Sequence, residues 1–145
     1  MKPASAKAKG RRLQMWVAKR IAHLLDVEVG PDCPVASREM GQSGPDIRLV
    51  GEARKLFPFY VECKNQERWS IPAWVDDLRK KTSGPMWLLF VSRNRFGRPV
   101  VVMDAEVFFE ICEMAKEQKT SGFLQRLLWS FPGIRKNYKA EGHEE

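Results

Sequence analysis

Two carboxylates and an amine are placed around two apolar segments in the middle of the chain. Asp46 precedes the run "IRLV", and Glu62 and Lys64 end the stretch "FPFYVECK". Side chains alternate along a strand, so Glu62 and Lys64 share one face while Val61 and Cys63 point to the other. Such charges at the end of a buried strand are costly unless something compensates them. Mg²⁺ or Mn²⁺, which prefer oxygen ligands, would do so.

These charges converge if the two apolar segments pair. A hairpin centred near Arg54 sets Asp46 opposite Glu62 and Val50 opposite Pro58, with a loop of about seven residues. The neighbouring amine would then orient or deprotonate a water and stabilise charge on a phosphorane. An ordinary cross-strand ion pair is the structural alternative, and spacing alone leaves both open.

The elements that must position these residues follow from apolar periodicity. A helix is expected from Arg11 to Leu25, with Leu13, Val17, Ile21 and Leu24 on its inner face. Ser70 is a suitable N-cap for a helix over 71–81. Strands are expected at 35–38, 46–50, 57–64, 86–92 and 99–104, and a further helix at 105–115. The order αβββαββα indicates an α/β domain around a mixed sheet.

Charge and composition divide the chain further. We expect a flexible basic arm at residues 1–10, one folded domain at 11–117, and a helical extension with an acidic tail at 118–145. The chain has 145 residues and a formal charge of +7, with its first acid at Asp26. A basic arm before a basic helix suits a polyphosphate partner, because neutralised phosphates release counterions. A solubilising tail is the alternative.

Several classes of protein are disfavoured. No apolar run approaches the roughly 18 residues of a membrane helix, and the N-terminus has no hydrophobic segment like that of a secretory signal. Cys33, Cys63 and Cys112 are odd in number and form no C-x-x-C pair, so they are expected as reduced thiols. The expected location is the cytoplasm.

The motifs "SGPDI" and "VECK" resemble those of the PD-(D/E)xK nuclease superfamily, which has the restriction-endonuclease-like fold. "KGRRLQ" and "SREMGQSGPDI…VECKNQ" are similar to the Holliday junction resolvases of that superfamily, especially small phage-encoded and archaeal-type members. The likeness covers roughly Lys9 to Met103. It implies an αβββαβ core whose mixed central sheet is flanked by helices, and for a phage-encoded protein it implies the host cytoplasm.

Site residues carry over from this resemblance one by one. It implies that Asp46, Glu62 and the backbone carbonyl of Cys63 bind Mg²⁺, for which Mn²⁺ would substitute. It makes Lys64 the catalytic lysine, and it places Gln66 near the attacking water or the scissile phosphate.

One position departs from the resolvase pattern. Resolvases carry a glutamate on the first helix where this chain has Gln14. An amide is a poorer metal ligand than a carboxylate, which weakens the case for a second metal ion. We expect Gln14, at the edge of the buried stripe, to reach the site through a water. Glu28 and Glu39 are the alternative sources of the missing carboxylate.

The residues expected to contact DNA lie on the arm and at the start of the first helix, around the serine-glycine loop, and after the catalytic strand. Arg38 would grip a phosphate or be an ordinary surface arginine. Trp69 would stack on an exposed base or pack in the core. The full set is Lys9, Arg11, Arg12, Arg38, Ser43 and Trp69.

The resemblance implies a Mg²⁺-dependent endonuclease that cuts branched DNA in recombination or repair, with four-way junctions as the expected substrate. Two coordinated cuts require a symmetric homodimer. One alternative is a restriction-like, nicking or repair nuclease acting on linear duplex or single strands. Another is an inactive DNA-binding module of the same fold.

Overall fold

The computed structural model describes residues 3–39, 41–95 and 97–117. These belong to two compact units, residues 1–104 and 105–145. The helices are α1 (Pro3–Leu25), α2 (Glu52–Leu56), α3 (Ile71–Lys81) and α4 (Ala105–Glu117). The strands are β1 (Val35–Ser37), β2 (Ile47–Leu49), β3 (Tyr60–Asn65), β4 (Trp87–Ser92) and β5 (Val100–Met103). The α/β class is therefore confirmed, and none of the described helices is long and apolar enough to cross a membrane.

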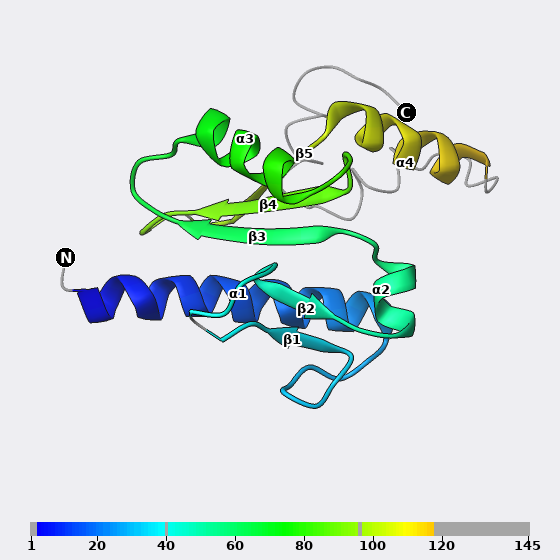
Figure 1. Ribbon diagram of the computed structural model, residues 1–145. Coiled ribbons are helices and arrows are strands. Elements are labelled where there is room, and N and C mark those ends of the chain that lie inside the picture. Colours follow the sequence, from blue (N-terminus) through cyan, green and yellow to red (C-terminus); the bar gives the residue numbers. More distant parts are fainter. Residues whose placement is uncertain (1–2, 40, 96, 118–145) are drawn as a thin grey trace, which may run out of the picture. The chain divides into compact units, whose positions relative to one another are not determined.

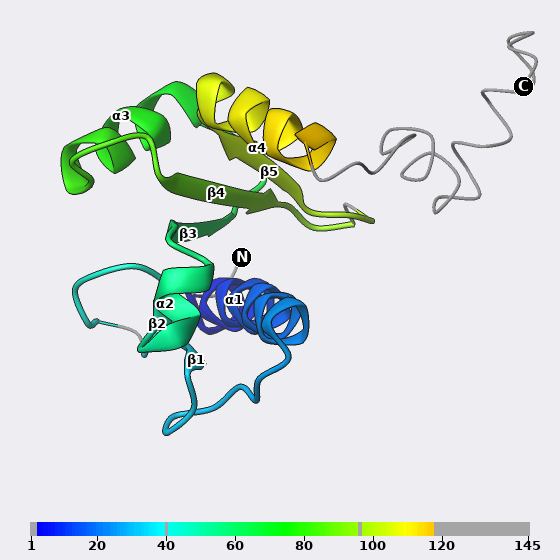
Figure 2. The ribbon, with the colours of Figure 1, turned by 90° about the vertical axis from the view of Figure 1, so that its right-hand side faces the viewer.

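The strands of the first unit form two sheets, of which the larger is mixed, as expected, while β1 and β2 are separate from it. β1 and β2 are an antiparallel pair. β3 lies parallel to β4, and β4 antiparallel to β5, so the larger sheet has the order β3-β4-β5. The parallel pair is joined by α3, as a crossover connection between parallel strands requires. Figures 1 and 2 show α3 on one face of this sheet and α1 on the other.

β2 and β3 do not form the predicted hairpin, because they belong to different sheets. The segment that joins them is not a simple turn of about seven residues, since it contains α2 (Glu52–Leu56). Gly51 enters this helix with a φ of 58°, a backbone conformation that favours glycine. Ala53 is buried in the core, so α2 packs against the first core cluster between the two strands.

The first helix is longer than its apolar stripe predicts. α1 begins at Pro3, so residues 3–10, expected as a flexible arm, are helical in the structure. Alanine and lysine, which dominate this segment, are good helix formers. Leu24, expected on the inner face, is 67% exposed. The buried face of α1 instead includes Ala18 and Ala22, which pack with Val35 of β1 and Ile47 of β2.

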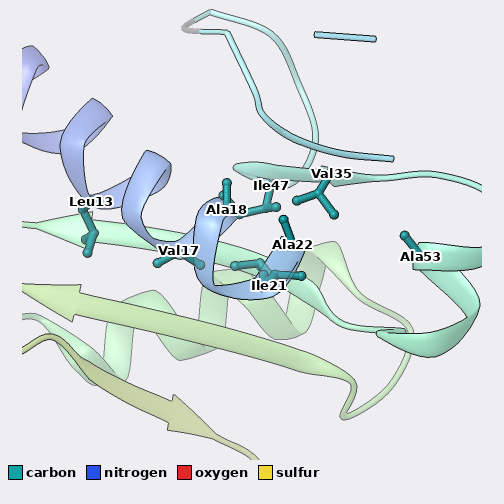
Figure 3. Packing of buried hydrophobic residues seen from close by; sticks show 9 residues of the cluster. Leu13, Val17, Ala18, Ile21, Ala22, Val35, Ile47 and Ala53 are labelled. Carbon is teal, nitrogen blue, oxygen red and sulfur yellow. The ribbon is translucent and has the colours of Figure 1, made fainter. Parts of the chain in front are cut away.

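Two apolar clusters cover the two faces of β3. Figure 3 shows the first, in which Leu13, Val17 and Ile21 of α1 lie toward the sheet, with Ala18 and Ala22 beside Ile47 and Val35. The second cluster joins Leu78 of α3 to Trp87, Leu89 and Val91 of β4. α3 has the predicted bounds, although Ser70 makes no capping hydrogen bond with its side chain. The β3 residues that matter for chemistry therefore lie between two packed layers.

The second compact unit begins at Ala105, the first residue of α4. The helical extension expected at 118–145 lies outside the described residues.

Candidate active site

Asp46 joins the two sheets. Its backbone N–H donates to the carbonyl of Val61 on β3 at 2.9 Å, and its own carbonyl accepts from the N–H of Arg38 at 2.7 Å. Its side-chain Oδ2 accepts from the backbone N–H of Cys63 at 2.7 Å. These contacts lie on either side of Glu62 in the β3 sequence. The carboxylate of Asp46 is thus fixed at the edge of β3 beside Glu62, through contacts of a single residue rather than a hairpin ladder.

Glu62 is almost fully enclosed, with 8% of the residue exposed. Its Oε1 lies 3.3 Å from Nζ of Lys81 and 3.7 Å from Nζ of Lys64. Its Oε2 is buried and has no hydrogen-bond partner among the described residues. A buried acceptor without a partner costs free energy, so this oxygen is suited to a ligand from outside the chain.

The electrostatics of Asp46 point the same way. Burial raises the pKa of Asp46 above its ordinary value, and the charge of Glu62 raises it further, although the hydrogen bond from Cys63 opposes both. The two carboxylates therefore repel each other in a poorly solvated place. A cation bound between them would relieve this repulsion.

Cys63 contributes through its backbone. Its side chain packs against the α1 cluster, and burial, followed by the charges of Asp46 and Glu62, raises the pKa of its thiol, which stays protonated. The N–H and C=O of one strand residue point to the same edge. The Cys63 carbonyl therefore points to the edge at which its N–H meets Asp46, where the resemblance implies a metal ligand.

Lys81 is a site residue that the sequence analysis missed. Its Nζ lies 2.9 Å from Oδ2 of Asp77 and 3.3 Å from Glu62. The signal was present in α3, because Trp74, Leu78 and Lys81 are four and three residues apart and fall on one helical stripe. Since Leu78 is buried against the sheet, Lys81 at the end of that stripe also reaches the sheet.

Gln14 and Gln66 do not contact the carboxylates. The Oε1 of Gln14 accepts from the hydroxyl of Ser37 on β1 at 3.0 Å. Gln66 is exposed, and its N–H donates to the carbonyl of Ser92 at 3.0 Å, which continues the pairing of β3 with β4. The side chain of Gln14 on α1 is therefore bonded to β1, while Gln66 lies just beyond the end of β3.

The alternative carboxylates of the sequence analysis also stay apart. Glu28 and Glu39 are exposed. Within the described ranges, no three His, Cys, Asp or Glu side chains gather at one place. The candidate centre therefore consists of two carboxylates and the Cys63 carbonyl.

The basic helix lies close to the end of β3. The Nδ2 of Asn65 donates to the carbonyl of Lys9 at 3.2 Å, which fixes the first half of α1 beside the strand that carries Glu62 and Lys64. Arg11 and Arg12 are exposed on the same helix.

The serine-glycine loop is held by Arg38. The Nε of Arg38 donates to the carbonyl of Pro45 at 2.6 Å. A Cβ on Gly44, whose φ is 112°, would lie 3.0 Å from the Arg38 guanidinium. Ser43 is exposed in this loop. Arg38 therefore has a structural contact, while its charge is not cancelled by any acid in the described chain.

Trp69 packs against the cluster of Leu78 and Trp87, as the core-packing alternative expects. Its Nε1 donates to the carbonyl of Gln66 at 3.1 Å. The three cysteines are free thiols.

No model of a known protein family matches the chain, and no curated protein matches it. The likeness to nucleases rests on the sequence motifs quoted above.

Proposed function

We propose that the chain is a Mg²⁺-dependent endonuclease that hydrolyses phosphodiester bonds in DNA, with its centre at Asp46, Glu62 and Lys64. One observation carries the proposal. The Oε2 atom of Glu62 is buried without a partner in the described chain, beside a second carboxylate whose pKa is raised. Two amines lie within 4 Å of the other Glu62 oxygen.

These groups fit a single hard cation. Mg²⁺ takes one or two carboxylates and completes its shell with waters and substrate phosphate. Asp46, Glu62 and the Cys63 carbonyl would hold it. When bound, the ion supplies Lewis acidity that activates water and neutralises phosphate charge.

Lys64 has a different task. Its side chain is 28% exposed, so its ammonium lies at the mouth of the site, while Glu62 lies deeper. An ammonium there donates hydrogen bonds to the phosphate oxygens and stabilises the charge that accumulates as water attacks. Glu62 orients this amine through the ion pair at 3.7 Å.

The proposed substrate is branched DNA, with four-way junctions first, and the proposed active form is a homodimer. The resemblance to resolvases suggests the substrate. The net charge of +7 and the basic α1 beside β3 suit a partner with many phosphates. Two coordinated cuts need two sites, which a symmetric dimer supplies.

The substitution Glu62→Gln tests the centre. It keeps the shape of the side chain but removes the charge that would hold the cation. We expect the nicking rate on a four-way junction in Mg²⁺ to fall at least about a hundredfold, while binding of the junction in Ca²⁺ is retained.

The matched control is Asp77→Asn, which removes the other carboxylate that pairs with Lys81. It should nick at close to the wild-type rate. A Glu62→Gln protein that cuts as fast as wild type would show that the centre is elsewhere. Linear duplex of the same sequence, added as competitor, measures the preference for the junction.

A further inference from the structure

A groove of about 710 Å³ opens beside the candidate centre, within the first unit. Lys81 lines it and also holds Glu62 at 3.3 Å. Pro45 and Ile47, which flank Asp46, line it too. The groove therefore runs up to the two carboxylates.

The charge of this groove has one sign. Its ionised lining side chains are Arg38, Arg48, Arg54 and Lys81, with no aspartate or glutamate among the described residues that line it. Lys81 is paired with Asp77 and Glu62, so the three arginines supply the positive charge that the groove offers to a ligand. The guanidinium of Arg48 donates to the carbonyl of Pro31 at 2.6 Å. Carbonyl partners orient Arg38 and Arg48 without cancelling their charge. The groove is thus prepared for an anion with several charges.

The same groove also has apolar walls. Phe59 and Tyr60 line it, as do Met86 and Val50, which are 37% and 41% exposed. Inorganic phosphate or a polyphosphate has no group for such walls. A nucleobase has an apolar face, and base faces are open in a single strand but stacked inside a duplex.

We propose that this groove holds a single strand of DNA that leads away from the scissile phosphate. Its phosphates would lie against Arg38, Arg48 and Arg54, and its bases against the apolar walls. The strand would be an unpaired arm or a locally opened end of a branched substrate. Its role as a path to the cutting site rests on the proposed function, but its affinity for a single strand does not.

The test compares two adjacent residues of α2. Arg54 lines the groove, whereas Lys55 does not and is 78% exposed. Anisotropy of a labelled strand of about 12 thymidylates reports binding by the full chain in EDTA, where no cleavage occurs. Arg54→Ala should weaken binding about fivefold and lower the salt slope by about 0.7, the value for one phosphate contact on a single strand. Lys55→Ala, with the same loss of charge, should leave both unchanged.

Two further ligands test the bases. An abasic strand of equal length should bind several-fold more weakly than the thymidylates, and a blunt duplex should be insensitive to Arg54→Ala. Equal effects of Arg54→Ala and Lys55→Ala would overturn the proposal, as would equal binding of abasic and thymidylate strands.

The groove and the nuclease proposal fail in different ways. Loss of binding in Arg54→Ala without any cleavage by the wild type would support the groove and refute the nuclease. Cleavage abolished by Glu62→Gln, with strand binding unaffected by Arg54→Ala, would refute the groove alone.

Discussion

Glu62 has one oxygen beside two amines and one oxygen that no described residue contacts. A side chain that served stability alone would be expected to have both oxygens hydrogen-bonded, because a buried unsatisfied acceptor is costly. Asp46 adds a second cost, since its charge is poorly solvated and close to that of Glu62. At the scale of single residues, the arrangement that suits the site to a cation therefore lowers the stability of the fold.

The pKa of Asp46 leads to a prediction about stability. Its pKa is raised above the ordinary value of 3.8, so the folded chain binds this proton more tightly than the unfolded chain. The contribution of Asp46 therefore lowers stability as pH rises from about 4 through the raised pKa, and the loss stays constant above it. Asp46→Asn keeps an acceptor for the N–H of Cys63 and removes the charge. Its melting temperature in EDTA at pH 7 should exceed that of wild type by a few degrees.

In Mg²⁺, the wild type should melt at a higher temperature than Asp46→Asn, the reverse of their order in EDTA. The ion should raise the melting temperature of the wild type, because it binds the folded state alone, but should leave Asp46→Asn unchanged. Asp76→Asn, whose carboxylate is 69% exposed on α3, is the control and should respond to Mg²⁺ as wild type does. A variant that melts below wild type in EDTA would contradict a repulsive Asp46.

At the scale of elements, the site depends on three segments that meet at β3. Asp46 arrives from the end of β2, Lys81 from the end of α3, and Lys9 from the first half of α1. Asp46 can bond the β3 backbone because the edge of β3 that faces away from β4 is not filled by a long partner strand, whereas Lys81 and Lys9 meet side chains of β3. Because β2 is short and α2 follows it, only Asp46 among the described residues bonds to this edge, through its backbone N–H and its carboxylate.

The length of α1 can be tested at Gly10. A Cβ at Gly10 would meet nothing within 4 Å, and the residue lies inside the helix. Gly10→Ala should therefore stabilise the protein by about 0.5–1 kcal/mol, because glycine loses more backbone entropy in a helix. Urea unfolding followed by circular dichroism measures this change.

Gly44→Ala is the opposing control. The φ of Gly44 is 112°, which an alanine adopts only with strain, so this variant should be less stable than wild type by about 1–3 kcal/mol. An unchanged stability of Gly10→Ala would place the start of the helix after residue 10.

At the scale of the whole molecule, the proposed paired cutting predicts assembly. One chain has a mass of 16.7 kDa and one candidate centre among its described residues. Sedimentation equilibrium at the concentration used for cleavage should give twice this mass. Mixing wild type with excess Glu62→Gln should convert paired cuts in a supercoiled cruciform plasmid into single nicks, because mixed dimers hold one working centre. A monomer that makes paired cuts would contradict the assembly.

Local patterns in the sequence were enough to predict α3, which has the expected bounds of 71–81, and β4, which begins one residue later than expected and ends at the expected residue. Their signals are apolar periodicity and turn residues, which act between near neighbours. The same kind of signal predicted that Glu62 and Lys64 share a face, since strand alternation needs no partner. It failed for residues 3–10, where helix propensity outweighed the lack of an apolar stripe.

The sequence by itself determined that two acids and an amine flank an apolar pair of segments in a basic α/β chain. Only the tertiary structure decided that the sheet is divided at Asp46, that α2 fills the link, and that Lys81 and the groove adjoin Glu62. These features depend on residues distant in sequence. Their contacts depend on how α1 and α3 pack on opposite faces of β3, which no local pattern specifies.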